Sequence, residues 1–130
     1  MVFAVTGTGR VAQGILDVLE LLPHQKIEPD DLKSHFESGN YDNKKVIISQ
    51  FKAKDLVRKV TAEVDEPFDK KDYYENPQNY SGKFHEYLPY VKFLVNGVYW
   101  EAKLPRVLCT KDLKQYHEMG KSGLMGVCDI

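Results

Sequence analysis

The chain opens with an apolar strand that runs directly into a glycine-rich turn and an amphipathic helix. Residues 2–6 are apolar or β-branched, and a Gly-x-Gly-x-x-Ala pattern follows at Gly7, Gly9 and Ala12. Gly7 permits a sharp turn, Gly9 lets the backbone approach phosphate oxygens, and Ala12 keeps the helix close to the sheet. The helix N-terminus offers free N–H groups to an anion. The pattern predicts a dinucleotide-binding turn, and its alternative is a strand–turn–helix corner without a ligand.

The helix after this turn is predicted over residues 10–22, and Pro23 ends it. Its apolar residues recur at helical spacing and are expected on one buried face: Val11, Ile15, Val18, Leu19 and Leu22. A short strand near residues 26–28 should follow. Glu28 then stands about where the ribose-binding carboxylate of such a motif is expected, roughly 20 residues beyond the turn.

Alternating strand and helix signals continue along the chain. The expected elements are a helix at 31–37 capped by Asp30 and Asp31, strands at 46–49 and 92–98, a helix from an N-cap at Thr110 to about 119, and a strand at 124–129. Residues 52–60 fit either a strand or a helix. The order predicts an α/β fold, a Rossmann-like doubly wound, mostly parallel sheet with helices on both faces.

Residues 65–83 interrupt this pattern with a polar, aromatic and proline-containing stretch. We expect a short helix at about 69–75 inside a surface insertion. Tyr73, Tyr74 and Tyr80 either stack on a ligand or anchor the loop to its own domain, and anchoring is the commoner role of such residues.

Composition excludes several classes of protein. The 130 residues carry a net charge of −1, are 42% hydrophobic and 28% charged, and suffice for one domain with its own core. The near-neutral charge argues against nucleic-acid or membrane-surface partners. No apolar run approaches the roughly 20 residues that span a bilayer, and no signal peptide is visible. We expect a soluble intracellular protein. Its first and last residues both read as core strands, which predicts a piece of a longer protein.

Cysteine and histidine usage gives no sign of a metal site. Cys109 and Cys128 stand in apolar surroundings and are expected to be reduced core residues, with a disulfide as the minority alternative. The histidines lack ligand spacing and are expected to be surface or structural residues: His24, His35, His85 and His117.

Longer blocks of sequence carry a more specific resemblance. They are Thr6–Gly9, Leu21–His24, Ile27–Pro29, Phe68–Tyr74, Leu88–Tyr90, Asn96–Glu101 and Gly126–Ile130. With these blocks the chain resembles the lysine-ketoglutarate reductase half of bifunctional aminoadipic semialdehyde synthases. That half is itself similar to saccharopine dehydrogenases and, more distantly, to alanine dehydrogenase and the NAD-binding part of transhydrogenase.

The resemblance implies an enzyme of lysine breakdown that condenses lysine with 2-oxoglutarate and reduces the imine to saccharopine with a reduced nicotinamide. It implies that residues 1–130 form the nicotinamide-dinucleotide-binding domain, without catalytic residues and without metal. The partners it implies are a separate substrate domain and the saccharopine dehydrogenase half of the same polypeptide. The isolated chain is then expected to be inactive and to reside in the mitochondrial matrix or the cytoplasm.

The expected cofactor contacts combine the motif with the resemblance. They are Gly7, Thr8, Gly9, Arg10, Val11, Ala12, Glu28, Asn96, Gly97, Tyr99 and Asp129. Arg10 is either a phosphate ligand or a solvated arginine, and Asn96 is either a ribose or amide contact or a turn residue of its Asn-Gly pair. Trp100 is expected to line the active-site cleft or to pack between domains.

The identity of the cofactor is left open by two opposing signals. A carboxylate at Glu28 favours the free 2′-hydroxyl of NAD(H) and repels a 2′-phosphate. The resemblance favours NADP(H), in which case Glu28 points away or Lys26 offsets its charge.

Two further hypotheses for the function are a non-catalytic dinucleotide-sensing module and the NAD domain of an alanine or saccharopine dehydrogenase. Exposed apolar edges also predict self-association of the chain. An adenosylmethionine-dependent methyltransferase, which also has a glycine-rich first loop, is disfavoured by the family blocks.

Overall fold

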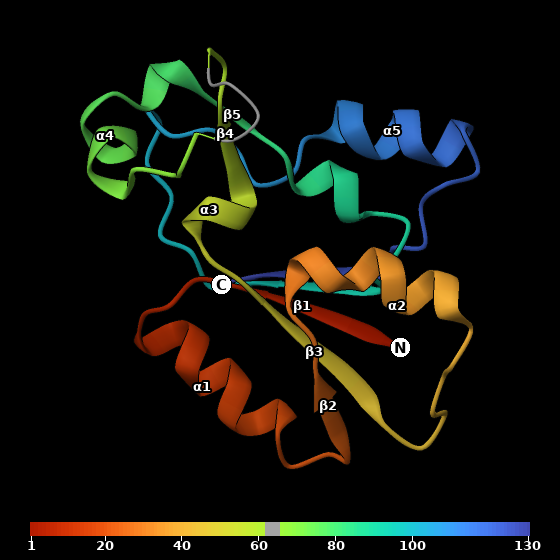
Figure 1. The fold of residues 1–130 in the computed structure, drawn as a ribbon. Coiled ribbons are helices and arrows are strands. Elements are labelled where there is room, and N and C mark those ends of the chain that lie inside the picture. The colour runs from red at the N-terminus through yellow and green to blue at the C-terminus, as the bar shows by residue number, and fades with distance from the viewer. Residues whose placement is uncertain (62–65) are drawn as a thin grey trace.

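The computed structural model describes residues 1–61 and 66–130, and its centre is a five-stranded parallel sheet (Figure 1). The strand order is β2-β3-β1-β6-β7. The strands are β1 (Val2–Thr6), β2 (His24–Lys26), β3 (Val46–Phe51), β6 (Phe93–Asn96) and β7 (Gly126–Asp129). β1 lies between β3 and β6, so its carboxyl end is at the middle of one edge of the sheet.

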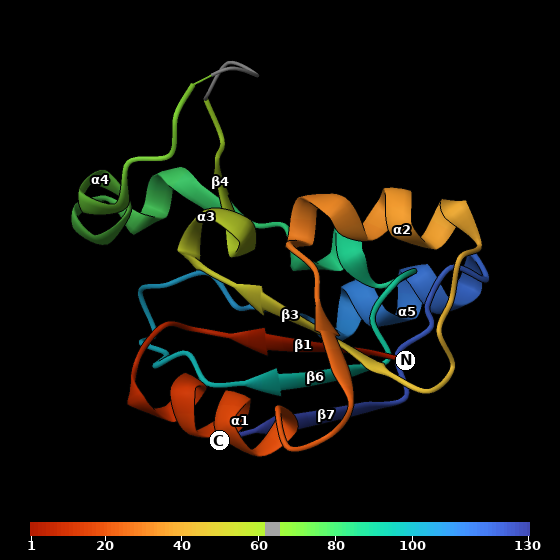
Figure 2. The ribbon, with the colours of Figure 1, turned by 60° about the horizontal axis from the view of Figure 1, so that its bottom comes forward.

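Helices cover both faces of the sheet, as expected for a doubly wound fold (Figure 2). One face carries α1 (Arg10–Leu19), and the opposite face carries α2 (Leu32–Ser38), α3 (Ala53–Leu56) and α5 (Thr110–Glu118). The Rossmann-like α/β prediction is therefore confirmed. The strand order has one unexpected feature, because β3 rather than β2 pairs with β1. The more common order places the second strand beside the first.

Each face of the sheet has its own core. On the α1 side, Val5 and Ile48 pack against Ala12 and Leu16 of the helix. The core on the opposite side is larger and includes Phe51, whose ring meets the rings of Phe84 and Tyr87 edge-to-face. Alternation of side chains along the strands explains the division, because neighbouring residues such as Ala4 and Val5 point to opposite faces.

The buried stripe of α1 differs from the predicted one. Ala12 and Leu16 are buried, and Ile15 and Leu19 are partly buried against the same core. The predicted core residues Val11, Val18 and Leu22 are exposed. Ala12, Ile15, Leu16 and Leu19 lie on one side of the helix, and Val11 and Val18 fall at its flank, because successive helical residues are about 100° apart. The helix also ends at Leu19, three residues before the predicted end.

Other helices and strands begin or end a few residues away from their predicted bounds. The second strand is His24–Lys26 and lies just before the predicted 26–28, and a 3₁₀ turn η1 (Pro29–Asp31) leads into α2 without a side-chain cap from Asp30 or Asp31. The stretch 52–60 contains both of its alternatives, α3 followed by β4 (Val57–Lys59). The N-cap of α5 is Cys109 rather than Thr110, which is the first helical residue.

The insertion folds onto one end of the sheet. It contains α4 (Lys70–Glu75), the 3₁₀ turn η2 (Pro77–Asn79) and β5 (Tyr80–Gly82), which pairs antiparallel with β4. A further 3₁₀ turn, η3 (Phe84–Tyr87), joins it to the strand β6. Tyr73 and Tyr80 are buried and contact each other and Phe68, whereas Tyr74 is exposed. Two of the three tyrosines therefore anchor the insertion. The part of the prediction that falls on residue 65 lies outside the described residues.

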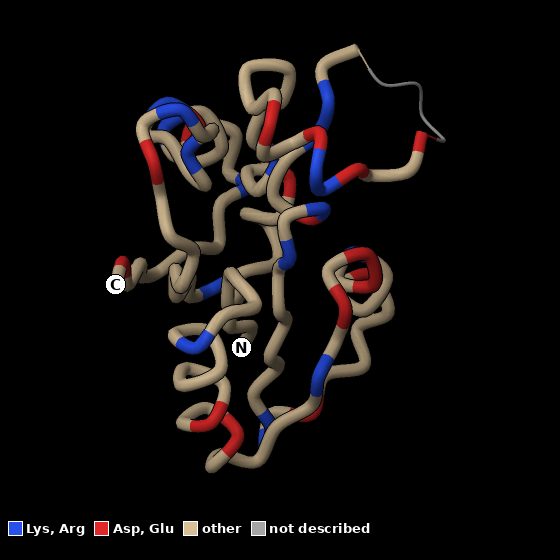
Figure 3. The backbone as a smooth tube through the Cα atoms, turned by 90° about the vertical axis from the view of Figure 1, so that its left-hand side faces the viewer, with Lys and Arg blue, Asp and Glu red and all other residues tan. Residues whose placement is uncertain are grey.

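The cysteine prediction was wrong in its burial. Both thiols are free, but Cys109 is only partly buried and Cys128 is exposed, because β7 is an edge strand of the sheet. Charges of both signs are interleaved along the described trace (Figure 3). Within residues 1–61 and 66–130, no helix has the length and apolar character needed to cross a bilayer.

A glycine turn and a polar strap at the carboxyl edge of the sheet

The turn between β1 and α1 is held from the neighbouring strand β3. Gly7 has a φ of 104°, which an L side chain rarely adopts. Its N–H donates to the carbonyl of Phe51 at 2.9 Å, and its carbonyl accepts a hydrogen bond from Gln50 Nε2 at 2.8 Å. Glycine at this position is therefore required by backbone conformation, as the motif predicts.

The N-terminus of α1 is open. Gly9 is its N-cap, with φ −86° and ψ −167°, and no described side chain caps the helix. A Cβ built on Gly9 would meet nothing within 4 Å. Thr8, Arg10 and Val11 around it are exposed. The chain therefore offers uncapped backbone N–H donors beside vacant space, and these donors fit the pyrophosphate of a dinucleotide.

Gly97 packs directly against this turn. A Cβ on Gly97 would stand 2.9 Å from the carbonyl oxygen of Thr6 and 3.3 Å from the Cα of Ala12. The Gly97 N–H donates to both oxygens of Thr6, each at 3.1 Å. The expected cofactor residues Gly7, Ala12 and Gly97 are thus brought together by close backbone packing.

A polar strap, formed by Thr6, Asn96 and Asp129, crosses the carboxyl ends of β1, β6 and β7. The Thr6 hydroxyl donates to Asn96 Oδ1 at 2.5 Å, and Asn96 Nδ2 donates to Asp129 Oδ1 at 2.8 Å. Asn96 is therefore held as a bridge between the ends of β1, β6 and β7. Among residues 1–61 and 66–130, the second carboxylate oxygen of Asp129 and the second amide hydrogen of Asn96 have no hydrogen-bond partner.

A cavity of about 210 Å³ adjoins the strap on the β6–β7 side. Its lining includes Asn96, Tyr99, Trp100 and Asp129. The sequence analysis singled out these four residues, and the structure places them around one cavity. The guanidinium of Arg106 lies 4.7 Å from the centroid of the Trp100 ring. Tyr99 is largely exposed, and Trp100 is 43% exposed.

Glu28 lies away from the glycine turn. It follows the edge strand β2, which is separated from β1 by β3, a distance of roughly 10 Å. Lys26 pairs with Glu20 at 2.5 Å, so its ammonium is already engaged with another carboxylate. The residue that follows the strand beside β1 is Lys52, which is exposed.

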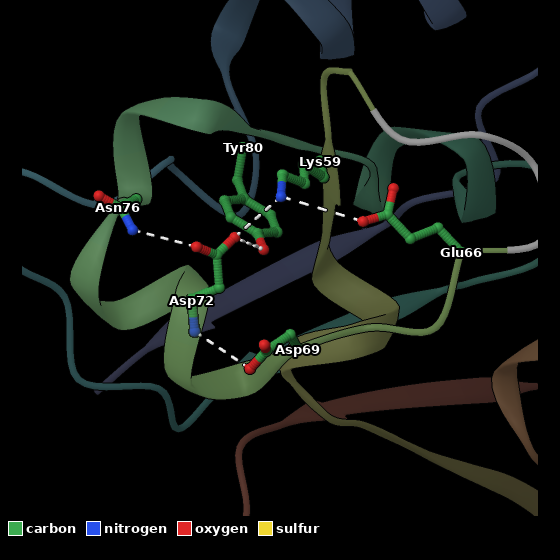
Figure 4. Close-up of polar contacts among 6 residues, drawn as sticks. All are labelled: Lys59, Glu66, Asp69, Asp72, Asn76 and Tyr80. Carbon is green, nitrogen blue, oxygen red and sulfur yellow. Dashed lines mark hydrogen bonds and ion pairs between the residues drawn. The ribbon is translucent and has the colours of Figure 1, made fainter.

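A second polar cluster lies in the insertion (Figure 4). Asp72 accepts hydrogen bonds from Tyr80 Oη at 2.7 Å and from Asn76 Nδ2 at 3.0 Å, and it pairs with Lys59 at 3.2 Å. These donors hold the pKa of Asp72 below its ordinary value, with Tyr80 as the largest cause. The same hydrogen bond raises the pKa of Tyr80 to about 12. The cluster ties α4 to β4 and β5.

The histidines are dispersed over the described structure. His24 is on β2, where Nδ1 contacts the Leu22 carbonyl at 2.8 Å, and His35, His85 and His117 belong to α2, η3 and α5. Sequence reasoning missed Thr6, Gln50 and Lys52 as neighbours of the turn. Their signal was positional, because Thr6 ends the predicted strand 2–6, and Gln50 and Lys52 come shortly after the predicted strand 46–49.

These features define a class of protein. The sheet is parallel, its central strand ends in a glycine turn, and α1 and α5 follow the neighbouring strands β1 and β6 on opposite faces of the sheet, which is a topological switch point. Such switch points are where open α/β domains bind ligands. The chain is a Rossmann-like α/β domain.

Curated relatives identify the family. The chain is 36% identical, in an alignment of 140 positions that covers its whole length, to the α-aminoadipic semialdehyde synthase of Arabidopsis thaliana. It is 34% identical, in alignments of 131 positions that cover 98% of its length, to the mitochondrial α-aminoadipic semialdehyde synthases of Bos taurus and Rattus norvegicus. The chain belongs to the α-aminoadipic semialdehyde synthase family as a homologue of one segment, and it spans 13% of the length of these relatives. No protein-family model matches it.

Proposed function

We propose that this chain is the nicotinamide-dinucleotide-binding part of a lysine-ketoglutarate reductase, the saccharopine-forming half of its family, and that it takes NADP(H). The observation that carries the proposal is the open N-terminus of α1 behind the Gly7–Gly9 turn, at the carboxyl end of the central strand. Homology to α-aminoadipic semialdehyde synthases over the whole chain supports it.

The two halves of the dinucleotide have distinct places in this proposal. The N–H groups of α1 bind the pyrophosphate, and Arg10 at the head of the helix adds positive charge. The cavity beside Asn96, Tyr99 and Asp129 receives the nicotinamide half. The adenosine half then extends toward β3, on the other side of β1.

The bound nicotinamide supplies the hydride that reduces the imine formed from lysine and 2-oxoglutarate. The residues of this chain bind and orient the nicotinamide. The strap holds the side chain of Asn96 in place, so that its second amide hydrogen is a rigidly positioned donor. General acid–base groups and the substrate site are assigned to the parts of the enzyme beyond this segment. The segment alone binds cofactor without turnover and, with the rest of its enzyme, belongs in the mitochondrial matrix or the cytoplasm.

The variant Gly9→Asp tests the dinucleotide site without a stability cost. The backbone at Gly9 is already in the extended region that N-cap residues adopt, and aspartate is a good N-cap. Its carboxylate would occupy the vacant space before the helix and repel a phosphate. We expect the variant to keep or raise its Tm while the affinity for NADPH, measured by calorimetry, falls at least about tenfold.

Gly14→Ala is the matched control for this variant. Gly14 lies inside α1, is exposed, and has nothing within 4 Å of a built Cβ. Its replacement should leave NADPH binding unchanged. Failure of the unmodified chain to bind NADPH, NADH, NADP or NAD would refute the proposal, as would full NADPH binding by Gly9→Asp.

A further inference from the structure

The strand order reassigns the residue that reads the 2′ position of the cofactor. In dinucleotide-binding sheets that position is read just after the strand beside the first strand. Here the neighbour of β1 on that side is β3, with Thr6 level with Phe51, whose carbonyl accepts the Gly7 N–H. The next residue along the chain is Lys52.

The place of Glu28 in the sheet argues against this role. Among the described strands, its strand β2 pairs with β3 alone and lies at the edge of the sheet. A ligand that spans the glycine turn has to cross the end of β3 before it reaches β2. The sequence spacing that singled out Glu28 counts residues from the turn, and it presumes that the second strand is also the neighbour of the first.

Lys52 has the chemistry of a phosphate reader. Its side chain is exposed, and it takes part in no ion pair among the described residues. Its backbone is held firmly, because its N–H donates to Asp55 Oδ2 and its carbonyl accepts from the Asp55 N–H, both at 2.9 Å. An ammonium on a fixed backbone next to the turn attracts a 2′-phosphate and gives nothing specific to a 2′-hydroxyl.

We propose that Lys52, at the end of β3, is the residue that selects NADP(H) over NAD(H) by contacting the 2′-phosphate, and that Glu28 has no part in cofactor choice. This inference rests on the proposed dinucleotide site. It also removes the conflict that Glu28 raised, since the carboxylate is two strands away from the turn.

The test uses the adenosine half of the cofactor, which separates 2′ recognition from the nicotinamide cavity. The full chain is titrated by calorimetry with adenosine 2′,5′-bisphosphate, adenosine 3′,5′-bisphosphate and 5′-AMP. We expect the 2′,5′ compound to bind at least about tenfold more tightly than 5′-AMP, and Lys52→Gln to abolish that preference without weakening 5′-AMP. The 3′,5′ isomer has the same charge and should gain little.

Lys54→Gln is the matched control. It removes the same charge two residues away, but Lys54 lines a different cavity, between α3 and the insertion. It should leave the preference intact, as should Glu28→Gln, and circular dichroism checks the fold of each variant. An unchanged preference in Lys52→Gln, equal binding of the two bisphosphates, or a new preference in Glu28→Gln would overturn the inference and leave the proposed function standing. Absence of binding by every dinucleotide would instead remove the proposed function and this inference with it.

Discussion

Gly97 lies so close to the end of β1 that a Cβ on it would stand 2.9 Å from the carbonyl oxygen of Thr6. Backbone atoms cannot move aside as the end of a flexible side chain can. We therefore expect Gly97→Ala to destabilise the chain by about 1–3 kcal/mol, measured by urea unfolding. Because the displaced segment adjoins the cavity, NADPH binding should weaken as well.

The control for this substitution is Gly14→Ala, which makes the same chemical change in open space on α1. It should stabilise the chain by about 0.5–1 kcal/mol, since alanine is the better helix former. Equal effects of the two substitutions would show that the approach of Gly97 to Thr6 is not tight.

Removal of the Thr6 hydroxyl breaks the polar strap at its buried end. Thr6 is fully buried, and its hydroxyl serves both Asn96 Oδ1 and the Gly97 N–H. Thr6→Val keeps the shape and should cost about 1–3 kcal/mol because two polar partners lose a hydrogen bond. Thr110→Val, at an exposed position, should change stability by less than about 0.5 kcal/mol. If Thr6→Val has the same thermal stability as the wild type, the hydrogen bonds of the strap do not stabilise the chain and the prediction is wrong.

The hydrogen bond between Tyr80 and Asp72 gives stability a defined pH window. The pKa of Tyr80 is raised to about 12, so its contribution is complete below its ordinary pKa near 10 and is lost as the pH rises toward 12. The pKa of Asp72 is lowered, so its contribution is present above its ordinary value and is lost as the pH falls through the depressed one. Tyr80→Phe should therefore destabilise the chain by an amount that is constant between about pH 5 and 9.

Chemical unfolding of both proteins across that range measures this difference. The exposed residue Tyr74, which lies on α4 with Asp72, provides the control Tyr74→Phe, which should cost little. A gap between the wild type and Tyr80→Phe that stays constant from pH 9 to 12 would argue against the contact.

The single tryptophan reports on the nicotinamide half of the proposed site. Trp100 lines the cavity beside Asn96 and Asp129. NADPH should quench its fluorescence saturably, whereas adenosine 2′,5′-bisphosphate, which lacks the nicotinamide, should bind without quenching. Quenching by both compounds would place the adenosine half in this cavity instead.

The exposed edge strand β7 is expected to promote self-association of the chain. β7 is an edge strand, and Val127 on it is 53% exposed. Unpaired edge strands with apolar side chains are prone to pairing between chains. We expect concentration-dependent association in light scattering and its reduction by Val127→Lys. Met119→Lys, at the end of α5, adds the same charge elsewhere and should not reduce it. A monomer at high concentration would contradict this expectation.

Most of the fold was readable from sequence because local signals agreed with it. The strand before Gly7, the helix after it and the β-branched run Val46–Ser49 each carry their own periodicity or turn residues. The errors lie where a neighbour decides the outcome. Which face of α1 is buried depends on how the helix packs against the sheet, and the burial of Cys128 depends on whether another strand covers β7.

The candidate site also has one part that the local sequence determined and another that only the tertiary structure decided. Local sequence determined the glycine turn, since the conformation of Gly7 and the open N-terminus of α1 are properties of a few consecutive residues. Only the tertiary structure decided that Asn96 bridges Thr6 and Asp129 and that Lys52, rather than Glu28, stands beside the turn. The physical reason is strand order: hydrogen bonds between strands join residues far apart in sequence, and spacing along the chain does not record which strands pair.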